Sequence, residues 1–410
     1  MAMRLYAVGQ RSETVRRANL SAIVRELHAS GARSRSDLVA RTGLTRSAIR
    51  GLIKEFVDAG LASEVRATPL GGPGRPSPLV RPNPESAVVL AVDIAVDSLA
   101  VALVGLGGEV IDLVRIQRPR GHSSVAEIVD QLAEQARVIL GRSNGEALIG
   151  VGVAVAGIVR RSDGFVAMAP NLGWRDVPLG APLSEALGAA VPISIANEAD
   201  LGALAELHRG AAVGADNVIY LSGEVGVGGG LIVDGKPLTG VAGFGGEVGH
   251  MPINRDGIAC QCGSFGCWET EVGEEALLRL AGHPAGGGWA EVDAVIDEAR
   301  AGSDAARGAF DTVGRWLGVG LAGLVNVFNP RLVVMGGLFG RIHPFVATAL
   351  EAELDRRTLP GSRALVRVVP ARLGVDAPLL GAAELAFEPL LADPAAWLRP
   401  RGARAELASA

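Results

Sequence analysis

The segment 247–269 holds the side chains best suited to bind a metal ion. It contains all three cysteines of the 410-residue chain, and a histidine lies ten residues before the first of them. Three thiolates and one imidazole complete a tetrahedral zinc site with no open position, so the spacing predicts a structural Zn²⁺. A disulfide is the competing interpretation, but pairing within C-x-C is strained. The predicted ligands are His250, Cys260, Cys262 and Cys267.

A second group of side chains suits contact with nucleic acid. Arg46, Arg50 and Lys54 recur every four residues, and the hydroxyl groups of Thr45 and Ser47 lie beside them. On a helix this spacing places the three cations on one face. Arginine pairs with guanine edges and with phosphates, so the pattern predicts a helix that enters the major groove of DNA. A solvated face on a plain three-helix bundle is the alternative.

The elements that would position this face follow the order of a winged helix-turn-helix. Apolar residues at helical spacing predict a helix over 14–28. The capping-box pair Ser34 and Asp37 opens a short second helix. A third helix over 44–60 would bury its apolar stripe and leave the cations outside. Residues 61–65 are strand-like and would begin a wing.

A segment rich in proline and glycine follows the predicted wing. Residues 66–84 contain six prolines and three glycines, so we expect a loop or linker without a helix or a central strand. Within it, Arg75 lies between a glycine and a proline. An arginine held extended in this way suits a narrow minor groove, where the negative potential is strongest.

Charge is divided unevenly along the chain. Residues 1–85 carry 14 Arg and Lys against 7 Asp and Glu, whereas the remainder carries 25 against 37. A basic head on an acidic body indicates a polyanionic partner. No apolar run reaches the roughly 18 residues of a membrane helix, and the N-terminus lacks the apolar core of a secretory signal. We therefore expect a cytoplasmic protein that does not bind membranes, in which cysteines serve as thiols or metal ligands.

The pattern changes to strands after residue 85, and one plan occurs twice. Three apolar runs separated by turns are followed by a helix and a further strand, and a similar order begins again near residue 217. Two copies of such a unit predict a bilobal α/β fold, in which a ligand would lie in the cleft between the lobes. The expected strands are 87–95, 98–106, 110–117, 147–156, 218–222 and 230–233, with a helix over 125–140.

The metal-binding segment also resembles the signature of the ROK family, through G-E-V-G-H followed by C-x-C-G-x-x-G-C-W-E. The resemblance covers roughly residues 86–390 and implies an actin-like, hexokinase-like (ribonuclease H-like) body. The family joins sugar kinases and sugar-responsive repressors, and a winged helix-turn-helix ahead of the body resembles the repressor branch. Further matching segments are Ala169–Leu172, Asn197–Glu206, Gly226–Gly230, Asn329-Pro330 and Gly336-Gly337.

The resemblance implies a sugar site formed by amides, carboxylates and an imidazole. These groups donate and accept hydrogen bonds in fixed directions, as a ring of hydroxyl groups requires. His250 would bind zinc through one ring nitrogen and face the sugar with the other, so the metal would hold part of the site in place. The implied sugar contacts are Asn171, Asn197, Glu198, Glu247, His250 and Glu269.

Three positions distinguish the chain from the kinases that it resembles. Glu198 stands where these kinases have an aspartate that takes a proton from the sugar, so it is a vestigial candidate for a base. The kinase phosphate loops resemble D-x-G-G-T and G-T-G, whereas this chain has Asp93–Asp97, read DIAVD, and Glu224–Gly226, read EVG. Like charges about 4 Å apart cost about 1–4 kcal/mol, so both loops disfavour ATP. The glycines that follow, in 227–230, are expected to serve a tight turn.

We therefore predict a regulator of carbohydrate genes, without enzymatic activity, that represses transcription and responds to a sugar. Its partners would be pseudo-palindromic operator DNA, a sugar effector and further copies of the chain in a homodimer or homotetramer. An active ATP-dependent sugar kinase with a DNA-binding head, and a protein whose head binds another protein, are the alternatives. The expected division is a winged helix-turn-helix over 1–66, a wing or linker over 67–84, a sugar-binding body over 85–390 and a tail over 391–410.

Overall fold

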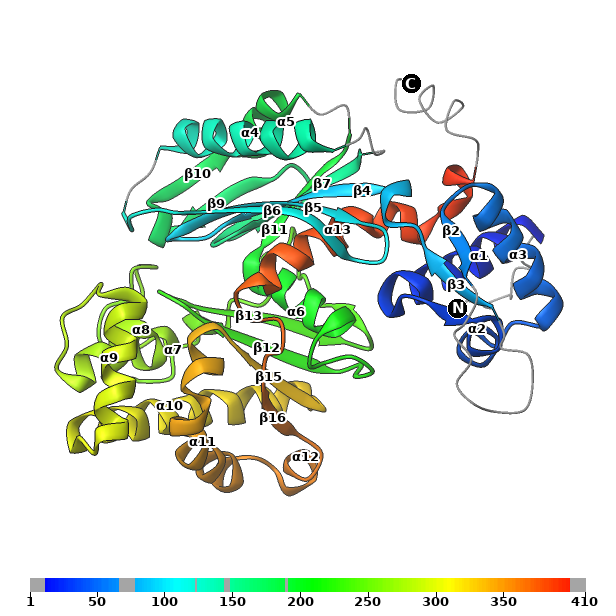
Figure 1. Ribbon diagram of the computed structural model, residues 1–410. Coiled ribbons are helices and arrows are strands. Elements are labelled where there is room, and N and C mark those ends of the chain that lie inside the picture. Colours follow the sequence, from blue (N-terminus) through cyan, green and yellow to red (C-terminus); the bar gives the residue numbers. More distant parts are fainter. Residues whose placement is uncertain (1–11, 66–77, 122–123, 144–147, 189–190, 399–410) are drawn as a thin grey trace, which may run out of the picture.

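The computed structural model describes residues 12–65, 78–121, 124–143, 148–188 and 191–398 (Figure 1). A small head at the N-terminus lies beside a larger body that has two lobes, one above the other in the view of Figure 1. None of the helices in these ranges combines the length and hydrophobicity needed to span a bilayer.

The head is a helix-turn-helix with a small sheet. The Ser34 hydroxyl accepts a hydrogen bond from the Asp37 amide, and the Asp37 carboxylate accepts one from the Ser34 amide, both at 3.1 Å. This confirms the predicted capping box, and Gly43 ends the second helix with φ +70°. The helices are α1 (Ser12–Ser30), α2 (Arg35–Thr42) and α3 (Arg46–Asp58), and the strands are β1 (Arg33–Ser34), β2 (Ala62–Val65) and β3 (Leu79–Pro82).

Strand β3 corrects the prediction that 66–84 forms only loop or linker. It is the central strand of the head's sheet, whose order is β1-β3-β2. Its antiparallel pairing with β2 runs from Val65 opposite Leu79 to Ala62 opposite Pro82. Proline is tolerated here because Pro82 lies at the end of the strand, where a missing N–H does not interrupt the ladder.

The first lobe is a five-stranded sheet of order β11-β7-β4-β5-β6, in which β4 pairs antiparallel with β5 and parallel with β7. Helices α4 and α5 cover one face of this sheet, and α13 covers the other. A separate sheet of order β10-β9-β8 extends from the lobe. The elements are η1 (Pro84–Ser86), β4 (Val88–Ile94), β5 (Ser98–Gly105), β6 (Glu109–Gln117), α4 (Val125–Arg142), β7 (Leu148–Val155), β8 (Ile158–Arg160), β9 (Phe165–Ala169), η2 (Pro170–Leu172), β10 (Trp174–Pro178), α5 (Gly180–Leu187) and β11 (Ile193–Asn197).

The second lobe repeats this connectivity and confirms the predicted duplication. Its sheet has the order β14-β13-β12-β15-β16, with β12 antiparallel to β13 and parallel to β15. Helices α6 and α13 lie between the two sheets, and α10 and α11 cover the far face of the second. The elements are α6 (Glu198–Arg209), β12 (Val218–Gly223), β13 (Val227–Val233), β14 (Lys236–Pro237), η3 (Val248–His250), α7 (Trp268–Val272), α8 (Glu274–Ala281), α9 (Gly288–Ala301), α10 (Asp304–Phe328), β15 (Leu332–Gly336), α11 (Gly337–Arg357), α12 (Pro360–Arg363), β16 (Arg367–Pro370), η4 (Gly374–Asp376) and α13 (Ala377–Ala392).

The glycines of 227–230 were expected to serve a tight turn, and this expectation is wrong. They belong to strand β13, and the turn before it consists of residues 224–226. A Cβ on Gly228 would lie 2.7 Å from the Ala199 side chain, and one on Gly230 would lie 2.5 Å from the Ala199 carbonyl oxygen. The glycines therefore allow α6 to pack closely on the strand.

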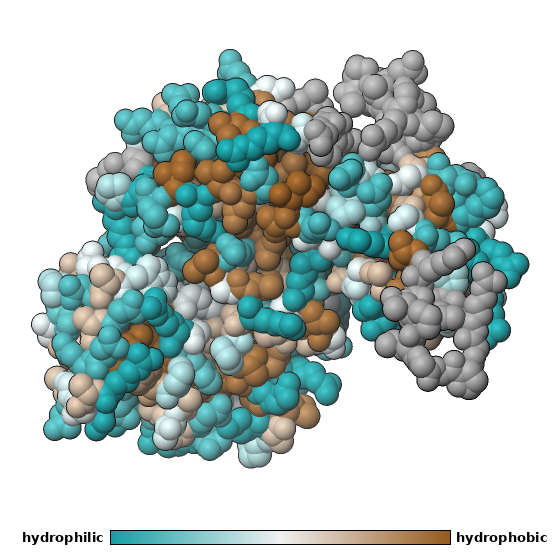
Figure 2. Space-filling view, in the orientation of Figure 1, coloured by the Kyte–Doolittle hydropathy of each residue, from teal (hydrophilic) through white to brown (hydrophobic). Residues whose placement is uncertain are grey.

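The head packs directly on the body. One hydrophobic core joins the apolar face of α1 to α13, with Leu20 and Ile23 on one side and Phe387 on the other. The helix η5 (Pro394–Trp397) also packs on α1, so the first part of the predicted tail is ordered against the head. Figure 2 shows hydrophobic side chains gathered over the middle of the body, around α13 and the neighbouring strands.

Candidate ligand cleft, metal centre and DNA-facing helix

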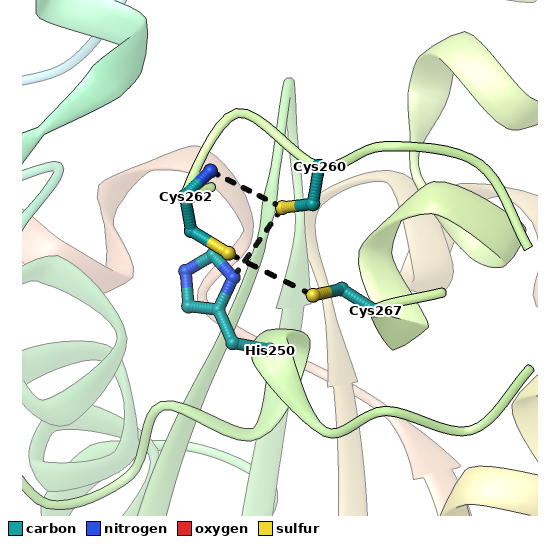
Figure 3. A group of neighbouring side chains, drawn as sticks. All are labelled: His250, Cys260, Cys262 and Cys267. Atoms are coloured by element: carbon teal, nitrogen blue, oxygen red, sulfur yellow. Dashed lines mark hydrogen bonds between the residues drawn. The ribbon is translucent and has the colours of Figure 1, made fainter. Parts of the chain in front are cut away.

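Four side chains of the second lobe converge as the metal-site prediction requires (Figure 3). Their possible ligand atoms, one nitrogen and three sulfurs, all lie within 4.8 Å of one another. Helix η3 supplies the histidine, the following loop supplies two cysteines, and the third is the N-cap of α7. The four residues are His250, Cys260, Cys262 and Cys267.

The distances in this cluster fit one tetrahedral metal ion. Cys262 Sγ lies 3.7 Å from Cys267 Sγ, and Cys260 Sγ lies 3.7 Å from His250 Nδ1. Metal–sulfur bonds of about 2.3 Å at tetrahedral angles place two sulfurs about 3.8 Å apart. A disulfide would need about 2.05 Å, and all three cysteines are free, so the structure contradicts the disulfide alternative.

The six side chains implied as sugar contacts line one cleft between the lobes. Asn171 comes from η2 and Asn197 from the end of β11, both in the first lobe. The others come from the first residue of α6, from η3 and its N-cap, and from α7. Val96 and Glu224, from the two loops at kinase phosphate positions, line the same cleft. The cleft residues of the implied set are Asn171, Asn197, Glu198, Glu247, His250 and Glu269.

Two of these side chains are held in place by other protein groups. Asn197 caps α6 by accepting from the Ala199 amide at 2.7 Å, and its amide group donates to the Gly157 carbonyl at 2.9 Å. Glu269 Oε1 lies 2.8 Å from Cys260 Sγ and 3.4 Å from His250 Nδ1. Glu269 therefore touches the metal cluster and the cleft together, which is the geometry by which a bound metal could hold the cleft in shape.

The cleft is strongly acidic on the side of the former phosphate loops. Burial, together with the charges of Glu224 and Asp93, raises the pKa of Glu198 well above its usual range. Burial and the charges of Asp93 and Asp97 raise the pKa of Glu224 to about 7, and burial raises the pKa of Glu247 to about 7. The burial and the neighbouring negative charges that disfavour the ionised form of these carboxyl groups also disfavour a further anion such as phosphate.

Arg120 was missed by the sequence analysis, because only the fold brings its partners to it. It follows β6 in the first lobe, and its guanidinium pairs with both oxygens of Glu274 on α8 of the second lobe, at 2.6 and 2.9 Å. It also reaches Asp97 at 3.3 Å. Glu274 is 2% exposed, so this is a largely buried ion pair across the lobes.

The predicted DNA-facing side chains lie on the outer face of α3 and at its start, and all of them are exposed. Thr45 is the N-cap, and its hydroxyl accepts a hydrogen bond from the Ala48 amide at 3.3 Å. Lys54 pairs with Asp58 one turn later, at 2.6 Å. The exposed set is Thr45, Arg46, Ser47, Arg50 and Lys54.

A hollow between α2 and α3 gathers three arginines on the same face. Arg46 and Arg50 line it with Arg35, which the sequence analysis did not single out. Arg35 is held by an ion pair with Glu64 of β2, at 2.9 Å from its Nε. Arg75, predicted to reach a minor groove, lies outside the described residues.

Comparison with known proteins gives matches of two kinds. The profile of the ROK family matches residues 89–388. The chain is 30% identical over 380 residues to the xylose repressor of Bacillus spizizenii, covering 92% of this chain and 97% of that repressor. It is 31% identical over 319 residues to the glucokinase of Streptomyces coelicolor, covering 74% of this chain and 98% of that kinase.

A solved structure is similar to this chain over nearly its whole length. It is a ROK family transcriptional regulator, a homologue of the E. coli MLC protein, with TM-score 0.74 and 25% identity over 92% of this chain and 97% of that chain. The 380-residue match to the repressor is longer than the body, so it extends into the head.

Proposed function

The chain belongs to the ROK family, and we propose from this premise that it is a sugar-responsive transcriptional repressor of carbohydrate genes. The proposal rests on one observation: the same chain has an exposed, cationic helix-turn-helix face and a cleft lined by six polar side chains. The match to a xylose repressor over 92% of the chain supports it. Residues 1–66 would bind DNA, and the body over 85–390 would bind the sugar.

In this proposal the sugar lies in the cleft, held by Asn171, Asn197, Glu198, Glu247, His250 and Glu269. The amides and carboxylates would contact hydroxyl groups, which supply both donors and acceptors. An uncharged sugar fits the acidic lining better than a phosphorylated one, because like charges repel more strongly in a desolvated cleft.

The DNA contacts proposed for the head are Thr45, Arg46, Ser47, Arg50 and Lys54 on α3 and Arg75 in the segment that follows β2. Helix-turn-helix proteins bind two half-sites about one or more helical turns apart through paired heads. We therefore propose a homodimer or homotetramer on a pseudo-palindromic operator.

The metal proposed for the cluster of His250, Cys260, Cys262 and Cys267 is Zn²⁺. Three sulfurs and a nitrogen at tetrahedral distances are the ligand set that zinc prefers, and the set leaves no open position for catalysis. A bound ion would be structural. It would fix Cys260 and His250, and Glu269, which contacts both, would then be held in place at the cleft.

Selection of genomic DNA fragments by the purified protein tests the proposal, with and without a pool of D-xylose, D-glucose and other common sugars. We expect enrichment of a pseudo-palindromic site whose recovery changes with the pool. A steep decrease of binding with salt would identify direct contact with DNA phosphates. Recovery of no fragment would overturn the DNA-binding assignment and favour a head that binds another protein.

An active sugar kinase is the second candidate, favoured by the match to a glucokinase and by a carboxyl group, Glu198, at the position of the base. Against it, burial and the charges of Glu224 and Asp93 raise the pKa of Glu198 well above its usual range, which disfavours the ionised form that a base requires. ATP-dependent phosphorylation of any sugar in the pool, abolished in Glu198→Gln, would establish the kinase instead.

A further inference from the structure

A buried polar cluster lies where the head meets the body, outside both the cleft and the DNA-facing helix. His28 and Glu384 at its centre are 2% and 3% exposed. Groups so deeply buried need partners within the protein. The cluster joins four segments through His28 on α1, Glu384 on α13, His208 and Arg209 at the end of α6, and Gly107 in the turn between β5 and β6.

Glu384 is the common partner of this cluster. Its Oε1 accepts from Arg209 Nε at 2.5 Å, and its Oε2 lies 2.9 Å from His208 Nδ1 and 3.2 Å from His28 Nε2. Burial alone would raise the pKa of Glu384, but His28, His208 and Arg209 hold it well below its usual range. The ionised carboxylate on α13 therefore binds side chains of both the head and α6.

Gly107 completes the arrangement around His28. Its amide donates to His28 Nδ1 at 3.0 Å, and its carbonyl accepts from Arg209 Nη1 at 2.9 Å. A backbone amide only donates, so Nδ1 is an acceptor and the ring proton lies on Nε2, which faces Glu384. Arg209 Nη2 also lies 2.8 Å from Nε2, but both atoms carry protons, so this is a close approach without a hydrogen bond. The guanidinium is therefore bonded to the turn and to α13 and lies directly beside the head.

The other end of α6 lies in the cleft. Asn197 caps the helix and Glu198 is its first residue, and both line the cleft. The helix has 12 residues. At about 1.5 Å per residue it spans about 18 Å from the cleft to the polar cluster.

Helix α6 is fixed to the second lobe along its length. The carboxylate of Glu206, 0% exposed, accepts from the amides of Arg372 and Leu373 at 2.9 and 2.8 Å, just after β16. The glycines of β13 bring that strand against the start of the helix. Helix α13 packs on β4 and β7 of the first lobe, on α1 and on α6, so the contact between α6 and α13 is where an element fixed to the second lobe meets one that holds the head. A change in the angle between the lobes therefore displaces the end of α6 relative to the head.

We propose that α6 transmits the response of the cleft to the head, and that Arg209 and Glu384 are the positioning residues that couple it to His28. This inference rests on the proposed function. Sugar bound at the start of α6 changes the angle between the lobes, the Arg209 guanidinium shifts on Gly107 and His28, and α1 changes its placement with α2 and α3. Coupling of this kind is a difference in DNA affinity between two states of the cleft.

The test uses the full chain with operator DNA and saturating D-xylose, comparing wild type with Arg209→Met. We expect the Kd for D-xylose to stay within about twofold, while the xylose-induced change in the Kd for DNA falls at least about fivefold. Arg209→Lys keeps the charge but loses the planar fork, so an intermediate loss is expected. This variant keeps the test decisive if Arg209→Met does not fold.

The matched control is Arg25→Met. Arg25 joins the same helices, α1 and α13, by an exposed ion pair with Glu388 at 2.5 and 2.9 Å, but it does not touch α6. The control is expected to keep the full response. An unchanged response in Arg209→Met, or an equal loss in Arg25→Met, would overturn the proposal.

A second measurement needs no sugar. Arg120→Met removes the ion pair that joins the lobes, so the Kd for DNA should change at least about threefold, and Arg209→Met should suppress that change. Additive effects of the two substitutions would overturn the coupling through α6. If wild type does not respond to D-xylose but the substitutions are non-additive, the coupling stands and the proposed sugar response fails for that sugar.

Discussion

The two halves of the cleft differ in how their polar groups are held. On the side of the proposed sugar contacts, Asn197 and Glu269 are held by other protein groups, one through a helix cap and the other beside the metal cluster. Toward the loops of 93–97 and 224–226, burial and then the charges of neighbouring carboxyl groups, including Asp93 and Asp97, raise the pKa of Glu198 and of Glu224. One half is prepared for a neutral ligand with many hydroxyl groups, whereas the other is unfavourable for an anion.

Under the proposed function, this difference would let a kinase-like fold keep ligand binding without phosphoryl transfer. The strand order of both lobes and the close packing of α6 are intact. Several carboxyl groups gather at one end of the cleft, and Arg115 and Arg120 offset part of their repulsion. The following changes test the comparison, beginning with the largest expected effect.

Cys260→Ser should remove the bound metal and weaken sugar affinity about 100-fold, because Glu269 and His250 lose their anchor. Metal analysis and calorimetric titration measure the two effects. Phe265→Ala, at a 66% exposed position of the same loop, is the matched control and should retain both. A variant that has lost the metal but binds sugar with wild-type affinity would show that the metal does not hold the sugar contacts in place.

Arg120→Met should destabilise the protein by about 3 kcal/mol, because it leaves the buried Glu274 without its bidentate partner. Urea unfolding measures the effect. Arg300→Met breaks a comparable but exposed pair with Asp297, and it should change stability by less than about 1 kcal/mol. Equal effects of the two substitutions would mean that the cross-lobe pair is no stronger than a surface pair.

Glu224→Gln should stabilise the protein at pH 8 by about 2 kcal/mol and have little effect at pH 5. The pKa of Glu224 is raised from 4.5 to about 7 in the folded state, so folding retains a proton that the unfolded chain releases. Wild-type stability therefore decreases as pH rises from about 4.5 through 7, and the substitution removes this group's share. Urea unfolding across this range is the measurement, and a stabilisation independent of pH would contradict the assignment.

Asn171→Ala should weaken sugar affinity about fivefold and leave the unfolding midpoint nearly unchanged, because it removes one hydrogen-bonding side chain from the first-lobe wall of the cleft. Titration with the sugar identified by fragment selection measures it. Unchanged affinity would place the sugar entirely against the second lobe.

Local patterns were sufficient to predict much of the fold. The capping box of Ser34 and Asp37, the helix boundary at Gly43 and the duplicated strand plan depend on residues near one another in sequence, and the structure confirms them. The spacing of the cysteines was likewise sufficient to predict the metal cluster, because all three lie within eight positions of the sequence.

Other features depended on partners far away in the chain. Pro82 ends a central strand because β2 and β1 flank it, and the glycines of 227–230 face a helix rather than form a turn. The bridge from Arg120 to Glu274 spans 154 positions, and the pair of His28 and Glu384 spans 356. No local sequence pattern predicts such pairs, because arginine, histidine and glutamate usually lie on the protein surface.

The sequence by itself determined which local elements form, which residues could hold a metal and which helix face carries cations, because helix caps, strand alternation and ligand spacing are short-range properties. The resemblance to the ROK family implied the six polar groups of the cleft. Only the tertiary structure decided that the lobes are joined by a buried ion pair and that α6 runs from the cleft to the head. The physical reason is that burial and ion pairing depend on neighbours in space, which are set by the packing of the two sheets around α6 and α13.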